Sequence, residues 1–199
     1  YCMLYTEALY RWFARPLKIF ERTKYRIDLR HLPNTSWESH VILFGYHRMG
    51  TIIAQTLERL HIQTLIVDFN PDIIERLIQE DRAAVYGDMS DQELLSELQL
   101  ENAQMIISTV PDVDDSSAFI RRVRAGHRRL PIYVTALNTE DALQLYAEGA
   151  DYVIFPHALS AFHFSTLLRN GVRDRRLFTI EKKKHIETLK GMAMKELPY

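Results

Sequence analysis

Apolar and polar residues along most of this chain form blocks of two kinds. Short apolar runs rich in Val and Ile are bounded by Gly, Pro and Asp, which is typical of strands buried in a parallel sheet. Between them lie longer segments whose apolar residues recur every three or four positions, as on one face of a helix. We expect strands at 40–44, 64–68, 83–86, 105–109, 131–135 and 152–155.

The segments between these strands have helix signals at their ends. Asn70 and Pro71 suit the cap and first position of one helix, and Gly149 suits the residue that ends another. Strand and helix alternate six times, which predicts an α/β fold: a Rossmann-like, doubly wound parallel sheet of six strands with helices on both faces. The helices are expected at 48–61, from 71 onward, around 94–98, and at 112–126, 139–149 and 158–169.

Residues 1–39 have a different pattern. Aromatic residues such as Trp12 and Phe13 are interleaved there with arginine and lysine, in what we expect to be a helical segment. It suits a membrane surface or a partner helix, and it equally suits a helix packed on the domain's own core. Residues 33–36 are turn-forming. We therefore expect a membrane-proximal leader and linker over 1–39, a folded domain over 40–171 and a charged C-terminal helix or tail over 172–199.

Composition narrows the class of protein. The 199-residue chain has 47% hydrophobic residues, as a globular protein does, and its formal net charge of -1 argues against a nucleic-acid binder. Cys2 is the single cysteine, so no internal disulfide is possible and a reducing compartment fits. No apolar run approaches the length that spans a bilayer. The chain begins with Tyr1 rather than Met, so we expect a piece of a longer polypeptide.

Residues 45–50 join the first strand to the first helix and carry the clearest candidate chemistry. Gly45 permits a tight turn, Gly50 lets the helix approach the strand, and the backbone N–H groups that follow form an anion site. The dinucleotide-binding fingerprint has a third glycine between them, where this chain has His47. Its ring would lie in the path of a pyrophosphate. Four roles are open for His47: a phosphate contact, a pH-responsive group, a side chain that fills the pyrophosphate site itself, or a surface histidine on a turn.

The next strands end in polar residues at the same edge of the expected sheet. Asp68 follows the glycine loop by about twenty residues, where an acid accepts hydrogen bonds from ribose hydroxyls; alternatively it closes a turn. Gly87 and Asp88 end the third strand, near the expected adenine edge, although Asp88 equally suits a helix cap. Thr109 ends the fourth strand and is expected to line the same crevice.

No sequence motif predicts catalysis or a metal centre. There is no Ser–His–Asp arrangement, no CxxC pair and no P-loop. His157 and His163 have no third ligand at suitable spacing, and no substrate domain follows that would hold a hydride acceptor. We expect neither catalytic nor metal-binding residues.

Several of these segments resemble the TrkA-N, or RCK N-terminal, domain family, which regulates potassium channels and monovalent cation transporters. Residues 41–50 resemble the family's opening strand and loop, and residues 65–71 its second strand and the turn after it. Its most specific motif is similar to residues 86–90 with 94–95 and 103–108, and its last strand to residues 149–156. The resemblance covers about residues 40–170. Residues 5–24 also resemble the segment that leaves the last membrane helix of Kef-type (CPA2) cation:proton antiporters.

The resemblance implies a cytosolic domain joined to the transmembrane transporter domain of the same polypeptide, at the cytoplasmic face of the cell membrane. Such domains usually form homodimers and bind NAD(H) or adenine nucleotides, and binding shifts the assembly between transport states. His47 favours AMP or another adenine nucleotide over NAD(H). The expected nucleotide-binding residues are Gly45, Tyr46, His47, Arg48, Met49, Gly50, Asp68, Phe69, Gly87, Asp88 and Thr109.

We therefore expect a nucleotide-binding regulatory domain of a monovalent cation (K+ or Na+):proton antiporter, and not an enzyme. Two alternatives stay open. A fragment of a soluble NAD-dependent oxidoreductase would need a catalytic Tyr–Lys pair or a further domain. A ligand-free dimerisation scaffold differs from the sensor only in that it binds no nucleotide.

Overall fold

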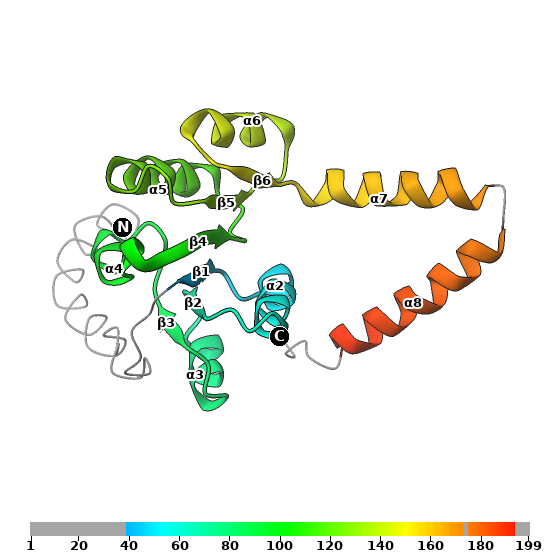
Figure 1. The fold of residues 1–199 in the computed structure, drawn as a ribbon, viewed down its shortest axis with the longest axis horizontal. Helices are drawn as coiled ribbons and strands as arrows, with labels where there is room; N and C mark the ends of the chain where they lie inside the picture. The colour runs from blue at the N-terminus through cyan, green and yellow to red at the C-terminus, as the bar shows by residue number, and fades with distance from the viewer. Residues whose placement is uncertain (1–38, 173–174, 194–199) are drawn as a thin grey trace, which may run out of the picture.

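The computed structural model describes residues 39–172 and 175–193, so the expected leader lies outside it apart from Ser39. Six parallel strands form one sheet in the order β3-β2-β1-β4-β5-β6 (Figure 1). This is the doubly wound sheet that the alternating pattern predicts. The strands are β1 (His40–Phe44), β2 (Thr64–Asp68), β3 (Ala84–Tyr86), β4 (Ala103–Ser108), β5 (Ile132–Thr135) and β6 (Tyr152–Ile154).

The central strand β1 pairs in parallel with β2 on one side and β4 on the other. All five of its residues are buried, which explains why the four that follow His40 are all apolar. The strand order reverses between β1 and β4. In doubly wound sheets, ligands bind in the crevice at the carboxyl ends of the strands beside this reversal.

Helices cover the sheet from two sides and bury two apolar clusters. The helices α2 (Arg48–Arg59) and α3 (Pro71–Gln79) cover one face, where Leu57, Ile74 and Leu77 pack. The opposite face is covered by α4 (Gln92–Glu97), α5 (Val113–Gly126) and α6 (Thr139–Glu148). A 3-10 turn, η3 (Leu100–Asn102), precedes β4.

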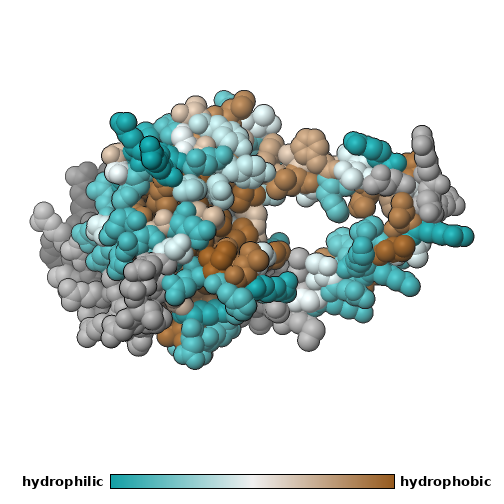
Figure 2. All heavy atoms as spheres, in the orientation of Figure 1, coloured by the Kyte–Doolittle hydropathy of each residue, from teal (hydrophilic) through white to brown (hydrophobic). Residues whose placement is uncertain are grey.

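Two helices extend from the body as an arm, which comprises α7 (Pro156–Gly171) and α8 (Arg175–Ala193). The arm leaves from the carboxyl end of β6, and Figure 2 shows an open space between it and the body. An added Cβ at Gly171 would lie 2.5 Å from the ring of Phe178, so the two helices pack closely at this point. Exposed large apolar residues of the arm are Leu159, Phe162, Phe164, Leu168, Leu177, Ile180, Ile186 and Leu189.

Several boundaries differ from the expected ones by one or two residues, and the fourth strand ends at Ser108 rather than at Thr109. The strand expected at 105–109 is β4, which begins at Ala103 because Ala103 pairs with His40 before a register shift. The helix expected at 158–169 is α7, which begins at Pro156, a residue suited to a first helical turn. Within the expected helix or tail over 172–199, α8 is helical over Arg175–Ala193. None of the described helices is both long and apolar enough to cross a membrane.

Candidate functional site

The loop between β1 and α2 depends on its two glycines. Gly45 has φ +85°, a left-handed conformation that favours glycine, and an added Cβ would lie 2.5 Å from the Thr109 hydroxyl oxygen. An added Cβ at Gly50 would lie 1.9 Å from the carbonyl oxygen of Gly45. The first turn of α2 therefore lies directly against the turn after β1. Both expected roles, the tight turn and the close helix approach, are present in the structure.

Neighbouring strands hold this loop through hydrogen bonds. The Tyr46 N–H donates to Oδ2 of Asp68 at 2.7 Å, and the Asn70 N–H donates to its other carboxylate oxygen at 2.8 Å. The Thr109 hydroxyl donates to the carbonyls of Phe44 (3.2 Å) and Gly45 (3.1 Å). Asp68 and Thr109 thus lie beside the glycine loop as expected, and both hold its backbone in place.

The start of α2, like that of α7, lacks features that the starts of α3 to α6 have. Each of those four helices has a capping side chain, namely Asn70, Asp91, Asp112 and Asn138, and at least one acidic residue in its first turn. In α2 the cap residue His47 makes no side-chain cap, and the first turn carries no acidic residue. Since helix N-termini attract anions, α2 presents the uncapped positive end of its dipole at the carboxyl edge of the sheet.

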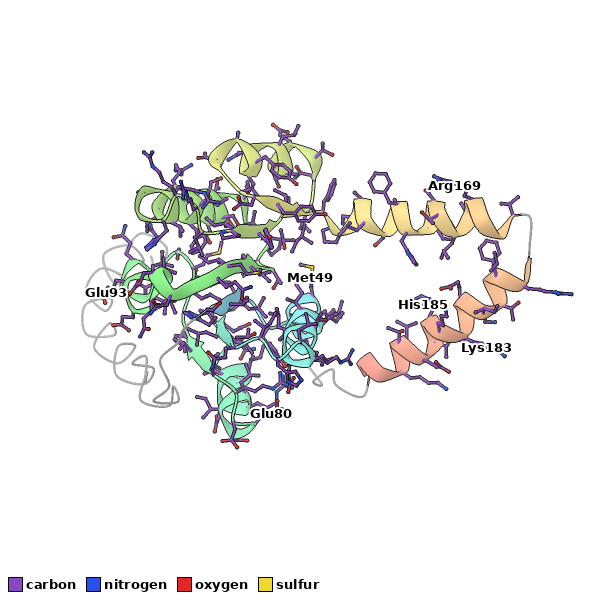
Figure 3. The ribbon with its side chains drawn as sticks, viewed as in Figure 1. Met49, Glu80, Glu93, Arg169, Lys183 and His185 are labelled. Atoms are coloured by element: carbon purple, nitrogen blue, oxygen red, sulfur yellow. The ribbon has the colours of Figure 1, made fainter. Side chains whose placement is uncertain are left out.

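His47 and Arg48 are exposed at this helix start, and Met49 is half-buried beside them. In Figure 3 the labelled Met49 projects from α2 toward the space below α7. The backbone of His47, with φ -80° and ψ -158°, is an ordinary conformation for any residue. The fold therefore does not require glycine at position 47, and what a glycine would add there is room for a ligand.

The end of β3 contributes an acidic rim. Asp88 is exposed, and its Oδ1 accepts the Ser90 N–H at 2.8 Å. Burial raises the pKa of Asp115 at the start of α5, and the neighbouring carboxylates of Asp112, Asp88 and Asp114 raise it further. Negative charge between β3 and α5 disfavours phosphate there and suits an uncharged base or ribose. Beside β2, Phe69 is 68% exposed and offers an aromatic surface.

The Tyr46 backbone lies in the candidate site, but its side chain points away from it. Its side chain is 5% exposed and packs in the apolar cluster beneath α2 and α3. Its hydroxyl accepts a hydrogen bond from Nη1 of Arg82 at 2.9 Å, and the guanidinium of Arg76 lies 5.9 Å from its ring centroid. Burial raises the pKa of Tyr46 above its ordinary value of 10.0, although Arg82 opposes this shift.

A separate hollow of about 330 Å³ lies at the opposite, amino-terminal edge of the sheet. Its lining includes Ala54, Glu58, Ile62 and Arg82. Within the described ranges, no three His, Cys, Asp or Glu side chains are grouped so that they could hold a metal ion.

The fold and loop together define a Rossmann-like, doubly wound α/β domain. The TrkA-N domain family matches residues 41–156, and the chain belongs to that family. This match includes the glycine loop, Asp68, Asp88 and Thr109.

Two relatives show where such domains occur. The chain is 24% identical over 170 residues to potassium channel protein 1 of Methanocaldococcus jannaschii, which covers 83% of this chain and 47% of that protein. It is 27% identical over 114 residues to the glutathione-regulated potassium-efflux system protein KefC of Klebsiella pneumoniae. That aligned region covers 57% of this chain and 18% of KefC. The chain is thus homologous to the TrkA-N domains of potassium channels and Kef antiporters, and it spans less than half of either relative's length.

Solved structures share this fold. The TrkA-N domain of the Escherichia coli inner membrane protein YbaL aligns with a TM-score of 0.63 at 22% identity, over 65% of this chain and 96% of that one. The AMP-bound Kef C-terminal domain of Shewanella denitrificans aligns with a TM-score of 0.58 at 22% identity, over 78% and 99%. The NAD-bound GsuK channel aligns with a TM-score of 0.57 at 24% identity, over 75% and 26%.

Proposed function

We propose that this chain is the nucleotide-binding regulatory domain of a monovalent cation:proton antiporter, acting at the cytoplasmic face of the cell membrane. The observation that carries the proposal is the start of α2. It is uncapped and free of acidic residues, and it follows a loop fixed by Gly45 and Gly50. Membership of the TrkA-N family and similarity to KefC support the link to transport.

The proposed ligand is AMP or another adenine mononucleotide. Its phosphate lies at the N-terminus of α2, near His47 and Arg48, and its ribose hydroxyls donate to the lone pairs of Asp68 that the Tyr46 and Asn70 amides leave available. The base lies toward Phe69 and Asp88, where the acidic rim disfavours phosphate. NAD(H) is disfavoured because its second phosphate and second nucleoside must pass the imidazole of His47. The neighbouring structures that contain AMP and NAD support an adenine nucleotide without selecting between them.

Regulation in this proposal needs no chemical step. A nucleotide that binds two conformations with different affinities shifts their populations, and the shift is passed to the transporter domain of the same polypeptide. A coupling of 1–3 kcal/mol is typical of such systems, which corresponds to about a fivefold to 150-fold change in affinity. The transported ion, K+ or Na+, belongs to that domain.

The proposal includes a homodimer in which the arm supplies the contact. Phe162 and Phe164 of α7 are 71% and 55% exposed, and Ile180 of α8 is 50% exposed. Apolar residues on both helices are visible in Figure 2. Because water contacts these side chains in a single copy, a second copy that covers them would gain hydrophobic stabilisation.

A thermal-shift series with AMP, ADP, ATP, NAD and NADH tests nucleotide binding. A ligand present at one hundred times its Kd stabilises the folded chain by about 2.7 kcal/mol, a shift that is easily measured. We expect the adenine mononucleotides to raise the Tm more than NAD or NADH at equal concentration. No shift with any of the five at millimolar concentration would leave the ligand-free scaffold as the better account.

A further inference from the structure

Tyr46 is the residue at which the glycine loop is joined to the helical layer below it. Its N–H donates to Asp68 at 2.7 Å, and its carbonyl shares the Thr51 hydroxyl (3.1 Å) with the His47 carbonyl (2.9 Å), so its backbone belongs to the candidate nucleotide site. Its side chain leaves that site and is buried with Leu57, Ile73 and Leu77.

The far end of the Tyr46 side chain meets a charged network. Arg82 donates to the Tyr46 hydroxyl at 2.9 Å and forms ion pairs with Glu58 at 2.6 Å and Glu80 at 3.4 Å. Glu58 lies on α2, whereas Arg82 lies between α3 and β3. The network therefore joins α2 to the connection between α3 and β3. Arg82 and Glu58 also line the hollow at the amino-terminal edge, which makes this end of the network reachable from solvent.

We propose that Tyr46 is a positioning residue for nucleotide binding. The Arg82–Tyr46 hydrogen bond fixes the position of the glycine loop relative to α2 and α3, and thereby places the amides that receive the phosphate. The inference rests on the proposed nucleotide site. A hydrogen bond from a charged donor has a preferred direction. The Arg82 guanidinium fixes the hydroxyl end of the Tyr46 side chain, and the Asp68 carboxylate fixes the Tyr46 N–H at the other end of the residue. An anion-binding loop depends on such placement because its N–H groups must converge on one point.

The test is Tyr46→Phe, which removes the hydroxyl and keeps the buried ring. We expect the Kd for AMP to rise by about threefold to tenfold, as for loss of one ordinary hydrogen bond. Tyr146→Phe is the matched control, because the Tyr146 hydroxyl also accepts a hydrogen bond, from the Val153 N–H at 3.1 Å beside β6. The control is expected to bind AMP as the unaltered chain does.

Two further measurements separate positioning from a general loss of stability. Amide hydrogen exchange of residues 45–51 reports the loop without nucleotide, and Tyr46→Phe is expected to speed exchange there while Tyr146→Phe does not. In a double-mutant cycle, Tyr46→Phe with Arg82→Met is expected to weaken AMP binding no more than the larger single change, because both remove the same contact.

Unchanged exchange and unchanged AMP affinity in Tyr46→Phe would overturn the inference, and so would independent, multiplying effects of the two substitutions. Failure of the unaltered chain to bind any adenine nucleotide is a different result, which contradicts the proposed function. The exchange measurement still decides in that case whether Tyr46 positions the loop.

Discussion

Gly50 shows how one position fixes the geometry of the candidate site. The space that a Cβ would need there is occupied by the Gly45 carbonyl oxygen, 1.9 Å away, and that oxygen belongs to backbone held by Thr109. No side-chain movement relieves such a contact. The close approach of α2 to β1 thus depends on the absence of a single methyl group.

Gly50→Ala is therefore expected to lower the free energy of unfolding by about 1–3 kcal/mol, as overpacking does, and to weaken AMP binding because the loop must move. Urea unfolding and calorimetry measure the two effects. Gly126→Ala, at the end of α5, is the control, since an added Cβ there has nothing within 4 Å. Equal stability of the two variants would contradict the close approach.

The buried Tyr46 phenol makes the free energy of unfolding depend on pH in the alkaline range. Burial raises its pKa in the folded state above 10.0, the value expected when unfolded, so the phenol ionises first in the unfolded chain. The contribution is complete below about pH 10 and is lost as the pH rises through the folded-state pKa. Tyr46→Phe should flatten this part of the pH profile in urea unfolding between about pH 9 and pH 11. Parallel profiles for the two proteins would contradict the assignment.

At the scale of elements, the predictable part of the fold is the part with a regular pattern. Apolar runs predict the six strands, and glycine spacing predicts the turn and the close helix approach, because these features depend on neighbours along the chain. The side-chain direction of Tyr46 was not predictable: a residue in a loop has no periodicity, and Arg82 is distant in sequence. The two hydrogen bonds that Asp68 accepts from backbone amides were likewise not predictable, because one of them comes from the glycine loop that folds over it.

Arg124 is another long-range feature that no local pattern indicates. It donates to the carbonyls of Gly149 and Leu130 and forms an ion pair with Asp151, which also accepts the Ile132 N–H. One side chain thereby connects the end of α5 with the turns before β5 and β6.

Arg124→Met is expected to lower the free energy of unfolding by about 2 kcal/mol, because it leaves half-buried carbonyls without their charged donor. Arg121→Met on the same helix is the control. Arg121 is 57% exposed and pairs with Glu148 at the surface, so its loss is expected to change stability by about 0.5 kcal/mol or less. Equal losses in urea unfolding would show that Arg124 does not join these elements.

At the scale of the whole molecule, the arm and the candidate site share the carboxyl edge of the sheet. The arm begins directly after β6, while the glycine loop follows β1 at the same edge (Figure 1). A partner that covers the start of α7 would lie at the same edge of the sheet as the candidate nucleotide site. In the function proposed above, a nucleotide bound there acts on the assembly without a chemical step.

Phe162→Asp is expected to shift the chain from dimer to monomer, because it places a charge in the proposed apolar contact. Sedimentation velocity over a range of concentrations measures the change. Leu143→Asp is the matched control, since Leu143 is 66% exposed on α6 of the body and Phe162 is 71% exposed on the arm. A Phe162→Asp variant that stays dimeric would place the contact elsewhere.

The central claim, that an adenine mononucleotide binds over the glycine loop, is tested most directly by calorimetric titration of AMP and NAD into the unaltered chain and His47→Gly. We expect the unaltered chain to bind AMP more tightly than NAD. We also expect His47→Gly to raise the affinity for NAD relative to AMP, because position 47 already has a backbone that glycine can adopt and only the ring is removed. Absence of AMP binding, or an equal effect of the substitution on both ligands, would contradict this claim.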